Sequence, residues 1–467
     1  MHFSFHEIKT DYTQKLAEYI HHLRYEDLPA EVTDRAKKII MQTIGVALAA
    51  PEVPLAKAAI SVGKQYNGPG GGDATVWIDG SKLSMVNAAF VNGTLSDLLD
   101  WEDCSWTGHP SAGAVPVAWA VAEGQKKSGK DLITAVVAAY EVYQRIAMVV
   151  DDPDDSNGWG LTSWQMFACV VPACKLLGLD PDQINQALGF GTACSPITAS
   201  LCHTTMSDAY HYLHGFRARD GVALTLAAKG GVENFMDCFD DPAAYEVHMT
   251  ANSHPEWYLK DLGERYLIME TLLKHWPANM WNQTPMELAH KITTENGIQP
   301  DDIAEIVIDP PTQLRMAFSP DGYSSLTHAQ FSIPFCIAAM LCDPRPGAHW
   351  YSRENMKNPR VLSLASKVKG GPSKEHTLVG SFDIMKEGTF PKKTLTITTK
   401  DGKVYSDSMD CLPGHPKKML SWEELSDRYR IQAGVSLPDE KVEEGVRILQ
   451  ALEEVPDVSA ISHILHR

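Results

Sequence analysis

Positive charge is scarce in this sequence, and long apolar runs are absent. The chain has 41 lysines and arginines against 59 aspartates and glutamates, so its formal net charge is -18 at pH 7. Such a charge argues against a nucleic acid or an anionic membrane as the partner. No uninterrupted apolar run reaches the roughly 20 residues that a transmembrane helix needs. The first residues lack the basic and then apolar pattern of a signal peptide, so we expect a cytoplasmic protein.

Paired cysteines are also missing. The nine cysteines are scattered between Cys104 and Cys411, and none has the C-x-x-C spacing of a zinc or redox site. This pattern excludes a disulfide framework and predicts reduced thiols. No cysteine triad has the spacing of an iron–sulfur cluster, and no cofactor motif appears. We therefore expect neither a metal nor a cofactor.

The first half of the chain is typical of packed helices. Apolar residues recur at helical spacing in residues 12–23 and 36–44. Residues 131–150 are apolar on nearly all sides, with Glu141 and Arg145 one turn apart. A buried glutamate needs a partner, and we favour a structural ion pair of these two residues over a catalytic role.

Beyond about Glu270 the pattern changes. Residues 303–309 alternate with period two and are followed by two prolines, which predicts a strand that ends there. Residues 394–405 predict a β-hairpin, and the apolar segment 331–341 predicts a core helix between these strands. This mixture is typical of an α+β domain. After Gly414 the sequence again predicts helices.

A short segment between two apolar helical runs concentrates acid and base. Asp100-Trp101-Glu102-Asp103 is followed a few residues later by His109. Carboxylates and an imidazole in one connecting loop are suited to proton transfer. The residues alone support an acidic helix end equally well, because Asp and Glu are common in such connections.

The order of several motifs resembles the MmgE/PrpD family, which includes 2-methylcitrate dehydratases, cis-aconitate decarboxylases and iminodisuccinate epimerases. The resemblance runs through the whole chain. Its motifs are Leu28-Pro29-Ala30-Glu31-Val32, Asn92-Gly93 before the acidic run, His109-Pro110-Ser111, Ser128-Gly129-Lys130-Asp131-Leu132, Lys175-Leu176-Leu177-Gly178-Leu179 and Gly414-His415-Pro416.

This resemblance implies a mainly α fold with two domains. A large helical domain would be formed by residues 1–269 and 411–467, and a smaller α+β lid domain by the inserted residues 270–410. The active site would lie in the cleft between the domains and would bind a small di- or tricarboxylic acid without a cofactor. Relatives are usually dimers, so we expect a homodimer.

The resemblance also implies site residues. Asp100, His109 and Lys274 match positions that the family uses. We assign carboxylate binding and charge stabilisation to Lys274, and general acid–base catalysis to His109, whose ordinary pKa lies near neutrality. Asp100 would orient the imidazole. Asp103, Cys104 and the neighbouring His275 are expected to contact the substrate, although Asp103 could serve only to cap a helix.

Four positions depart from the family pattern. Tyr210 stands where relatives commonly carry a lysine, and Gly160 where many have a histidine. Cys104 replaces the hydroxyl residue of the decarboxylases, and Phe335 replaces a tyrosine of the lid. The substitutions remove a cation, an imidazole, a hydroxyl and a phenol from the expected site.

A stretch rich in histidine and tyrosine offers substitutes. Its members are His203, Tyr210, His211, Tyr212, His214, Arg217 and Arg219. We expect a loop here in which His203, His211 and Arg219 bind substrate and Tyr210 moves a proton, if a nearby cation lowers its pKa. The alternative is a surface or subunit contact, where Tyr and His are common. The spacing of the histidines does not match a known metal motif.

Three functions remain open. The favoured one is a lyase that dehydrates a 2-methylcitrate-like hydroxy acid. The second is decarboxylation or epimerisation of a related polycarboxylate, where Tyr210 opposite His109 would supply the second proton-transfer group of an epimerase. The third is a non-catalytic relative that binds a carboxylate or a protein partner.

Overall fold

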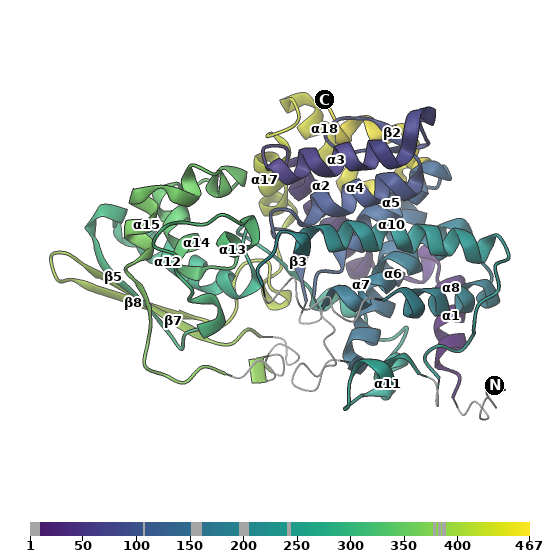
Figure 1. The fold of residues 1–467 in the computed structure, drawn as a ribbon, viewed down its shortest axis with the longest axis horizontal. Coiled ribbons are helices and arrows are strands. Elements are labelled where there is room, and N and C mark those ends of the chain that lie inside the picture. The colour runs from purple at the N-terminus through teal and green to yellow at the C-terminus, as the bar shows by residue number, and fades with distance from the viewer. Residues whose placement is uncertain are drawn as a thin grey trace.

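The computed structural model describes residues 10–467 except for 106–107, 151–160, 196–204, 241–243, 377–379, 382–383 and 385–388. The described chain is mainly helical, as expected, with small sheets (Figure 1). The helices of the first part are α1 (Tyr12–His22), α2 (Ala30–Leu48), α3 (Pro54–Asn67), α4 (Met85–Asp97), α5 (Ser111–Gly124), α6 (Gly129–Val150), α7 (Leu161–Leu177), α8 (Pro181–Cys194), α10 (Ala209–Lys229) and α11 (Tyr245–Met249).

Helix α6 is the central helix of this part. It packs against α5 and α7, and it is buried over almost its whole length. It is long and apolar enough to cross a membrane by length and composition, but the whole of that window is buried inside the protein. Arg145 Nη1 lies 2.7 Å from Glu141 Oε2, which confirms the expected ion pair. The same carboxylate accepts the backbone N–H groups of Leu267 and Ile268, so this pair fastens the chain to α6 just before the second part begins.

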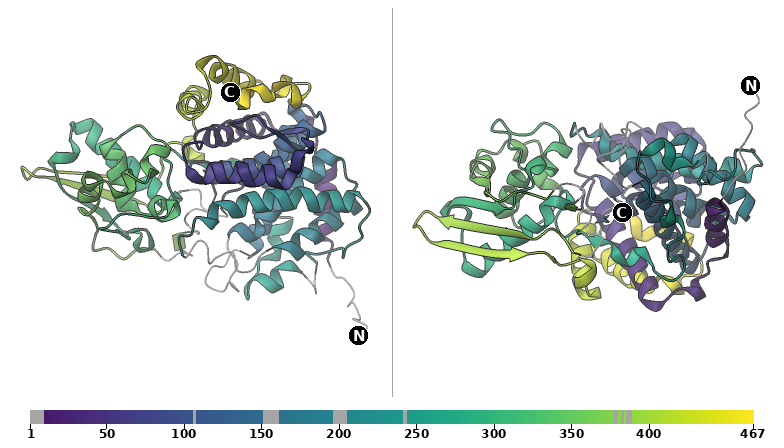
Figure 2. Two further views of the ribbon diagram at one scale, coloured as in Figure 1. Left: turned by 45° about the horizontal axis from the view of Figure 1, so that its top comes forward. Right: turned by 90° about the horizontal axis from the view of Figure 1, so that it is seen from below.

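The second part is built on a four-stranded sheet with the order β6-β5-β7-β8. Its strands are β5 (Ile303–Asp309), β6 (Val368–Gly370), β7 (Lys393–Thr399) and β8 (Val404–Met409). The β7–β8 hairpin confirms the predicted one, and its tip lies at the end of the molecule far from the helices of the first part (Figure 2). Its helices are α12 (Met280–Asn296), α13 (Leu326–Gln330), α14 (Ile333–Cys342) and α15 (Pro359–Ala365).

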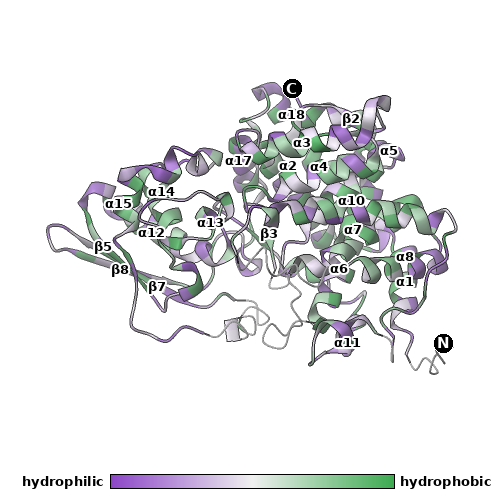
Figure 3. Ribbon diagram, in the orientation of Figure 1, coloured by the Kyte–Doolittle hydropathy of each residue, from purple (hydrophilic) through white to green (hydrophobic). Residues whose placement is uncertain are grey.

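Helix α12 packs on β7 and β8 and also on α14, so one face of the sheet is covered by helices. Alternate residues of β7 are buried, which is the pattern of a strand with one face toward a core. Figure 3 shows the apolar residues gathered between the elements and the polar ones along the outer faces.

The chain end returns to the helical part. Helices α17 (Trp422–Ala433) and α18 (Asp439–Gln450) pack against α2. In Figure 2 these last helices lie beside the first ones. The boundaries at residues 269 and 410 and the action of the second part as a lid stay predictions.

The histidine- and tyrosine-rich stretch is not the loop that we expected. From Ala209 onward it is the start of α10, so Tyr210, His211 and His214 lie in the first turns of a helix. The prediction missed the helix because aromatic and histidine residues have modest helix propensity. Packing against α4 supplies the stabilisation that propensity does not.

Candidate active site

Two very short strands join the acidic segment to Lys274. Strand β3 (Asp103–Cys104) pairs antiparallel with β4 (Leu272–Leu273). The ladder continues by one more bond, 3.1 Å long, from the Lys274 N–H to the carbonyl of Glu102. Because β4 leads into α12, the ladder lies where the chain passes from the helical part to the second part (Figure 1).

Buried donors fix the backbone around this ladder. Gln42 Nε2 donates to the carbonyl of Trp101 at 2.7 Å and to that of Lys274 at 3.2 Å. Arg428 Nη1 donates to the same Lys274 carbonyl at 2.7 Å. Gln165 Nε2 donates to the carbonyl of His109 at 3.0 Å. These side chains come from α2, α17 and α7, so three helices hold the segments in register.

The Lys274 ammonium lies between two carboxylates. It donates to Asp100 Oδ1 in a short contact and to Glu102 Oε1 at 2.8 Å. All three side chains are fully buried. Burial acts to lower the pKa of Lys274, but the charges of Asp100 and Glu102 outweigh it and raise the pKa above the usual range. The lysine is therefore a fixed positive charge.

Asp100 reaches the ammonium from an unusual backbone conformation. Its φ of 48° lies in the left-handed region, which non-glycine residues seldom adopt. Its N–H donates to the Asp97 carbonyl at 2.9 Å, which closes the turn after α4. Strain of this kind persists where the surroundings enforce it and is concentrated at functional sites.

His109 connects the carboxylates to Tyr210. Its Nδ1 forms a short contact with Glu102 Oε1, and its Nε2 lies 3.1 Å from the Tyr210 hydroxyl. In the neutral ring, Nδ1–H donates to the carboxylate and Nε2 accepts the phenol proton. Burial and the Lys274 charge act to lower the pKa of His109, whereas Glu102 and Asp100 raise it, and its pKa lies above the ordinary value. The two carboxylates therefore stabilise the imidazolium when His109 accepts a proton.

The condition set for Tyr210, a nearby cation that lowers its pKa, is not met. Burial and the charges of nearby carboxylates, of which Asp97 acts most strongly, raise its pKa well above the ordinary value, and the Arg315 guanidinium only partly opposes them. Arg315 comes from the second part of the chain and lies over the Phe331 ring at 4.5 Å from its centroid. The Phe331 ring in turn meets the Tyr210 ring edge-on at 5.6 Å. Tyr210 therefore holds its proton unless His109 takes it.

A second carboxylate lies beside these rings. Asp97, the last residue of α4, accepts a hydrogen bond from His211 Nδ1 at 2.6 Å, and His214 Nε2 lies 3.4 Å from its other oxygen. Burial acts to lower the pKa of His211, but the hydrogen bond and charge of Asp97 raise it above the ordinary value. Burial lowers the pKa of His214 to about 4, so that ring is neutral.

The contact between α4 and α10 depends on glycine. A Cβ atom on Gly215 would lie 2.0 Å from Thr94 Oγ1 and 2.6 Å from the carbonyl oxygen of Phe90. The absence of a side chain lets the two helices approach until His211 and His214 reach Asp97. The Asn92-Gly93 motif contributes from the other helix, since a Cβ on Gly93 would lie 3.0 Å from Ala218 Cβ.

Asp103 and Cys104 lie on β3 but serve other contacts. Asp103 accepts a short hydrogen bond from the Tyr140 hydroxyl and a longer one, 3.3 Å, from the Ser111 N–H at the start of α5. The helix-capping alternative thus fits its geometry. The Cys104 thiol is buried in a small apolar cluster with Met148 and Leu272, and burial raises its pKa above the usual range.

The remaining predicted residues lie outside the cluster or outside the described chain. Arg219 pairs with Asp220 at 2.7 Å, toward the middle of α10. His275 Nδ1 lies 2.7 Å from Glu287 Oε2 and its ring stacks on Trp276. Phe335 packs against Tyr323 and Tyr351. His203 and Gly160 lie outside the described residues.

Four members of the cluster were not assigned a role from the sequence: Asp97, Glu102, His214 and Arg315. Glu102 was visible as part of the acidic run. His214 was visible three positions after His211, a spacing that places both on one face of a helix. Asp97 and Arg315 gave no signal, because each reaches the site only through contacts between distant segments.

Several buried polar atoms of the cluster lack a hydrogen-bond partner among the described residues. They are Asp97 Oδ1, Asp100 Oδ2, Glu102 Oε2, His211 Nε2 and both ring nitrogens of His214. Buried polar atoms are nearly always hydrogen-bonded in native proteins, and an unpaired one costs about 1–3 kcal/mol. A group of them around His109 leaves hydrogen-bonding capacity there that water or a polar ligand would satisfy.

The cluster also contains ligand atoms close enough together for a cation. One atom each from Asp97, Glu102 and His109 lie within 4.8 Å of one another. Lys274 Nζ, however, lies 2.8 Å from Glu102 Oε1 and 3.2 Å from His109 Nδ1, so a positive charge is already at two of the three ligands. We assign no metal to this set.

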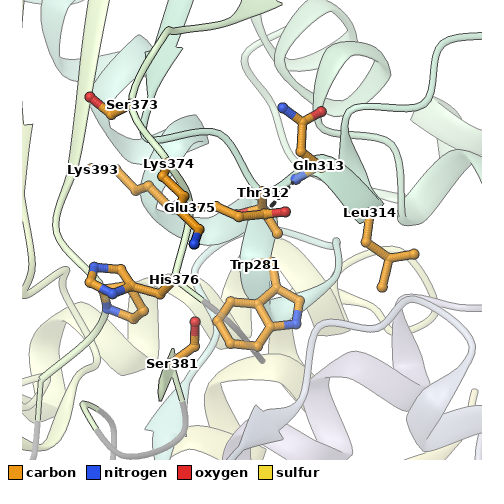
Figure 4. A pocket seen from close by; sticks show the side chains of 11 residues that line it. Trp281, Thr312, Gln313, Leu314, Ser373, Lys374, Glu375, His376, Ser381 and Lys393 are labelled. Carbon is orange, nitrogen blue, oxygen red and sulfur yellow. Dashed lines mark hydrogen bonds between the residues drawn. The ribbon is translucent and has the colours of Figure 1, made fainter. Parts of the chain in front are cut away.

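A separate pocket of about 490 Å³ lies in the second part (Figure 4). Trp281, Gln313, Glu375 and Lys393 are among its lining residues, and Glu375 accepts the Gln313 N–H at 2.8 Å. It contains none of the residues gathered around His109. One of its walls is the short 3-10 helix Gln313–Arg315, whose last residue lies toward Tyr210.

The sequence matches two models of one family. The MmgE/PrpD N-terminal domain matches residues 14–257, and the MmgE/PrpD C-terminal domain matches residues 276–454. The human cis-aconitate decarboxylase is 25% identical over 469 residues, which cover 97% of this chain and 94% of the relative. The mouse enzyme is 26% identical over 474 residues, covering 97% and 93%. The Aspergillus terreus cis-aconitate decarboxylase is 24% identical over 491 residues, covering 98% and 96%.

Proposed function

The chain belongs to the MmgE/PrpD family, and on that premise we propose that it is a lyase that acts on a small di- or tricarboxylic acid. The reaction begins with removal of a proton alpha to a carboxylate. The observation that carries the proposal is the chain of contacts from Glu102 through His109 to the Tyr210 hydroxyl, which lies 3.1 Å from His109 Nε2. A buried phenol next to a carboxylate-held imidazole is a proton relay.

In the first step the substrate C–H bond breaks. The phenol oxygen of Tyr210 takes the substrate proton while the Tyr210 proton moves to His109 Nε2. The two transfers are coupled because the raised pKa of Tyr210 disfavours a free phenolate. Glu102 stabilises the imidazolium that forms, and the pKa of His109 already lies above its ordinary value.

Negative charge then develops on the substrate carboxylate. Arg315 is the nearby cation that is suited to stabilise this charge, since its guanidinium interacts electrostatically with both Tyr210 and Asp100. Lys274 has a different role in this proposal from the one expected: its ammonium pairs with Asp100 and Glu102 and so holds both carboxylates in position. Preorganised charge in a water-excluded site is effective in stabilising such an intermediate.

The finer assignment that we favour is dehydration of a 2-methylcitrate-like hydroxy acid. Loss of a β-hydroxyl from the carbanion gives a conjugated unsaturated acid and water. The cluster supports this reaction because it offers more than one proton-transfer group, and elimination needs one group to take a proton and another to give one. A second candidate is decarboxylation of an unsaturated tricarboxylic acid, which the similarity to the human and fungal cis-aconitate decarboxylases favours.

A product assay separates the candidates. The purified protein is incubated in deuterated water with citrate, 2-methylcitrate, cis-aconitate and simple dicarboxylic acids, and proton NMR follows each acid. A new olefinic signal with loss of the hydroxy acid supports dehydration. Release of CO₂ from cis-aconitate supports decarboxylation. Inversion of the alpha carbon without loss of a group supports epimerisation. Folded protein that alters none of these acids would contradict the lyase proposal.

A further inference from the structure

A second carboxylate–imidazole pair lies in the same cluster and has no role in the first step. His211 Nδ1 donates to Asp97 Oδ2 at 2.6 Å, and both side chains are fully buried. Its geometry parallels that of Glu102 and His109: a carboxylate holds Nδ1 and directs Nε2 away from itself.

The outer nitrogen of this second imidazole is unsatisfied. His211 Nε2 is buried and has no hydrogen-bond partner in the part of the chain that the structure describes. Asp97 Oδ1 and His214 Nε2, which lie 3.4 Å apart, and His214 Nδ1 also have no hydrogen bond of good geometry among the described residues. A pair that served only to fasten α10 to α4 would not need a second, unsatisfied polar atom in the interior. The unsatisfied Nε2 therefore points to contact with a bound ligand.

The two imidazoles lie around one phenol. The Tyr210 ring centroid is 6.2 Å from that of His109 and 5.4 Å from that of His211. A substrate that reaches the Tyr210 hydroxyl therefore lies near both rings. His211 also differs from His109 at its outer nitrogen, because His109 Nε2 is engaged with the phenol and His211 Nε2 is not.

We propose that His211, held by Asp97, is the general acid that protonates the hydroxyl group leaving the substrate. This inference rests on the proposed function and adds a catalytic residue to it. Asp97 favours the protonated form of the imidazole, since the hydrogen bond and charge of the carboxylate raise the pKa of His211 above the ordinary value despite burial.

The electron pair left by the alpha proton forms the carbon–carbon double bond. The C–O bond to the β-carbon breaks, and its electron pair leaves with the oxygen. That oxygen takes the Nε2 proton of His211 and departs as water. His211 is then neutral and His109 is an imidazolium, so one proton returns from His109 to His211 before the next turnover.

The test separates the two proton transfers. In deuterated water, His211→Gln is expected to exchange the alpha proton of the hydroxy acid within about threefold of the wild-type rate. Its elimination of water is expected to fall by about 100- to 10,000-fold, the usual contribution of a general acid. A β-chloro analogue of the same acid should restore elimination, because chloride leaves without a proton. His21→Gln is the matched control, since this histidine of α1 hydrogen-bonds to the Leu179 carbonyl and lies outside the cluster.

Three results would overturn the inference. One is an equal loss of exchange and elimination in His211→Gln, which indicates a purely structural pair. Another is unchanged elimination of water. The third is failure of the chloro analogue to react in a variant that still exchanges the alpha proton. If His211→Gln does not fold, Asp97→Asn preserves the shape of the pair and must show the same split between exchange and elimination.

Failure of the proposed function gives a different result. In that case the wild-type protein itself neither exchanges the alpha proton nor eliminates water from any acid of the panel. When the wild-type protein does exchange the alpha proton and eliminate water, the difference between exchange and elimination in the variants therefore tests the role of His211 alone.

Discussion

Lys274 Nζ lies 2.8 Å from Glu102 Oε1, although the two residues are 172 positions apart in the sequence. The contact exists because β3 and β4 pair where the helical part leads into the second part. It places a fixed positive charge behind the carboxylate that holds His109. The site is therefore assembled by the same ladder that joins the two parts of the fold.

Replacing Lys274 tests this assembly. Lys274→Met leaves Asp100 and Glu102 buried without a cation, and removal of one partner of a buried ion pair typically costs about 3–5 kcal/mol. We expect the free energy of unfolding in urea to fall by about that amount. Lys291→Met is the control, because it breaks an exposed pair with Asp407 and should leave the unfolding midpoint unchanged. Equal midpoints for wild type and Lys274→Met would show that the ammonium does not neutralise these carboxylates.

In the proposed mechanism the phenol oxygen of Tyr210 receives the substrate proton. Tyr210→Phe keeps the ring and removes the hydroxyl, so we expect alpha-proton exchange to fall by about 100- to 10,000-fold while the fold is retained. The rate is measured by NMR in deuterated water, and circular dichroism checks the fold. Tyr212→Phe is the matched control on the same helix, since the Tyr212 hydroxyl donates to the Leu55 carbonyl at 2.9 Å. Full activity in Tyr210→Phe would remove Tyr210 from the relay.

Most of the fold could be predicted from the sequence, whereas the contacts among the side chains of the site could not. Period-two alternation gave β5 and the hairpin, and helical periodicity gave α6 with its Glu141–Arg145 pair. Asp100, His109 and Lys274 were predicted and lie together. The partners Asp97 and Arg315 were missed, because contacts between distant segments leave no local pattern. Arg219 and His275 were included through sequence proximity, but Asp220 and Glu287 hold them outside the cluster.

His214 makes the protein sensitive to acid. Burial lowers its pKa to about 4, whereas an unfolded histidine has a pKa of about 6.5. Between these values the unfolded chain binds the proton and the folded protein does not, so stability falls as pH falls. From pH 7 to pH 5 this group alone removes about 2 kcal/mol.

The comparison with a variant isolates this effect. His214→Gln should lose less stability than the wild type between pH 7 and pH 5, by about that same 2 kcal/mol, in urea unfolding at both pH values. His463→Gln, a change at an exposed histidine paired with Glu444, should follow the wild type. Parallel losses in wild type and His214→Gln would mean that His214 is not a buried neutral ring.

The approach of α4 and α10 can be tested at Gly215. A methyl group there would meet Thr94 Oγ1 and the Phe90 carbonyl, and overpacking of this kind typically costs about 1–3 kcal/mol. We expect Gly215→Ala to unfold at lower urea concentration and to slow elimination, because His211 is displaced from Asp97. Gly70→Ala is the control, since no atom lies within 4 Å of a Cβ at that position. Unchanged stability in Gly215→Ala would show that the contact between α4 and α10 can accommodate a methyl group at this position.

The central claim is that removal of the substrate alpha proton depends on His109, which takes the Tyr210 proton as the phenol oxygen takes the proton from the substrate carbon. The most direct measurement is alpha-proton exchange of the reactive acid in deuterated water, compared between wild type and His109→Gln by proton NMR. We predict exchange by the wild type and a loss of at least about 100-fold in the folded variant. Exchange at the wild-type rate in His109→Gln would contradict it.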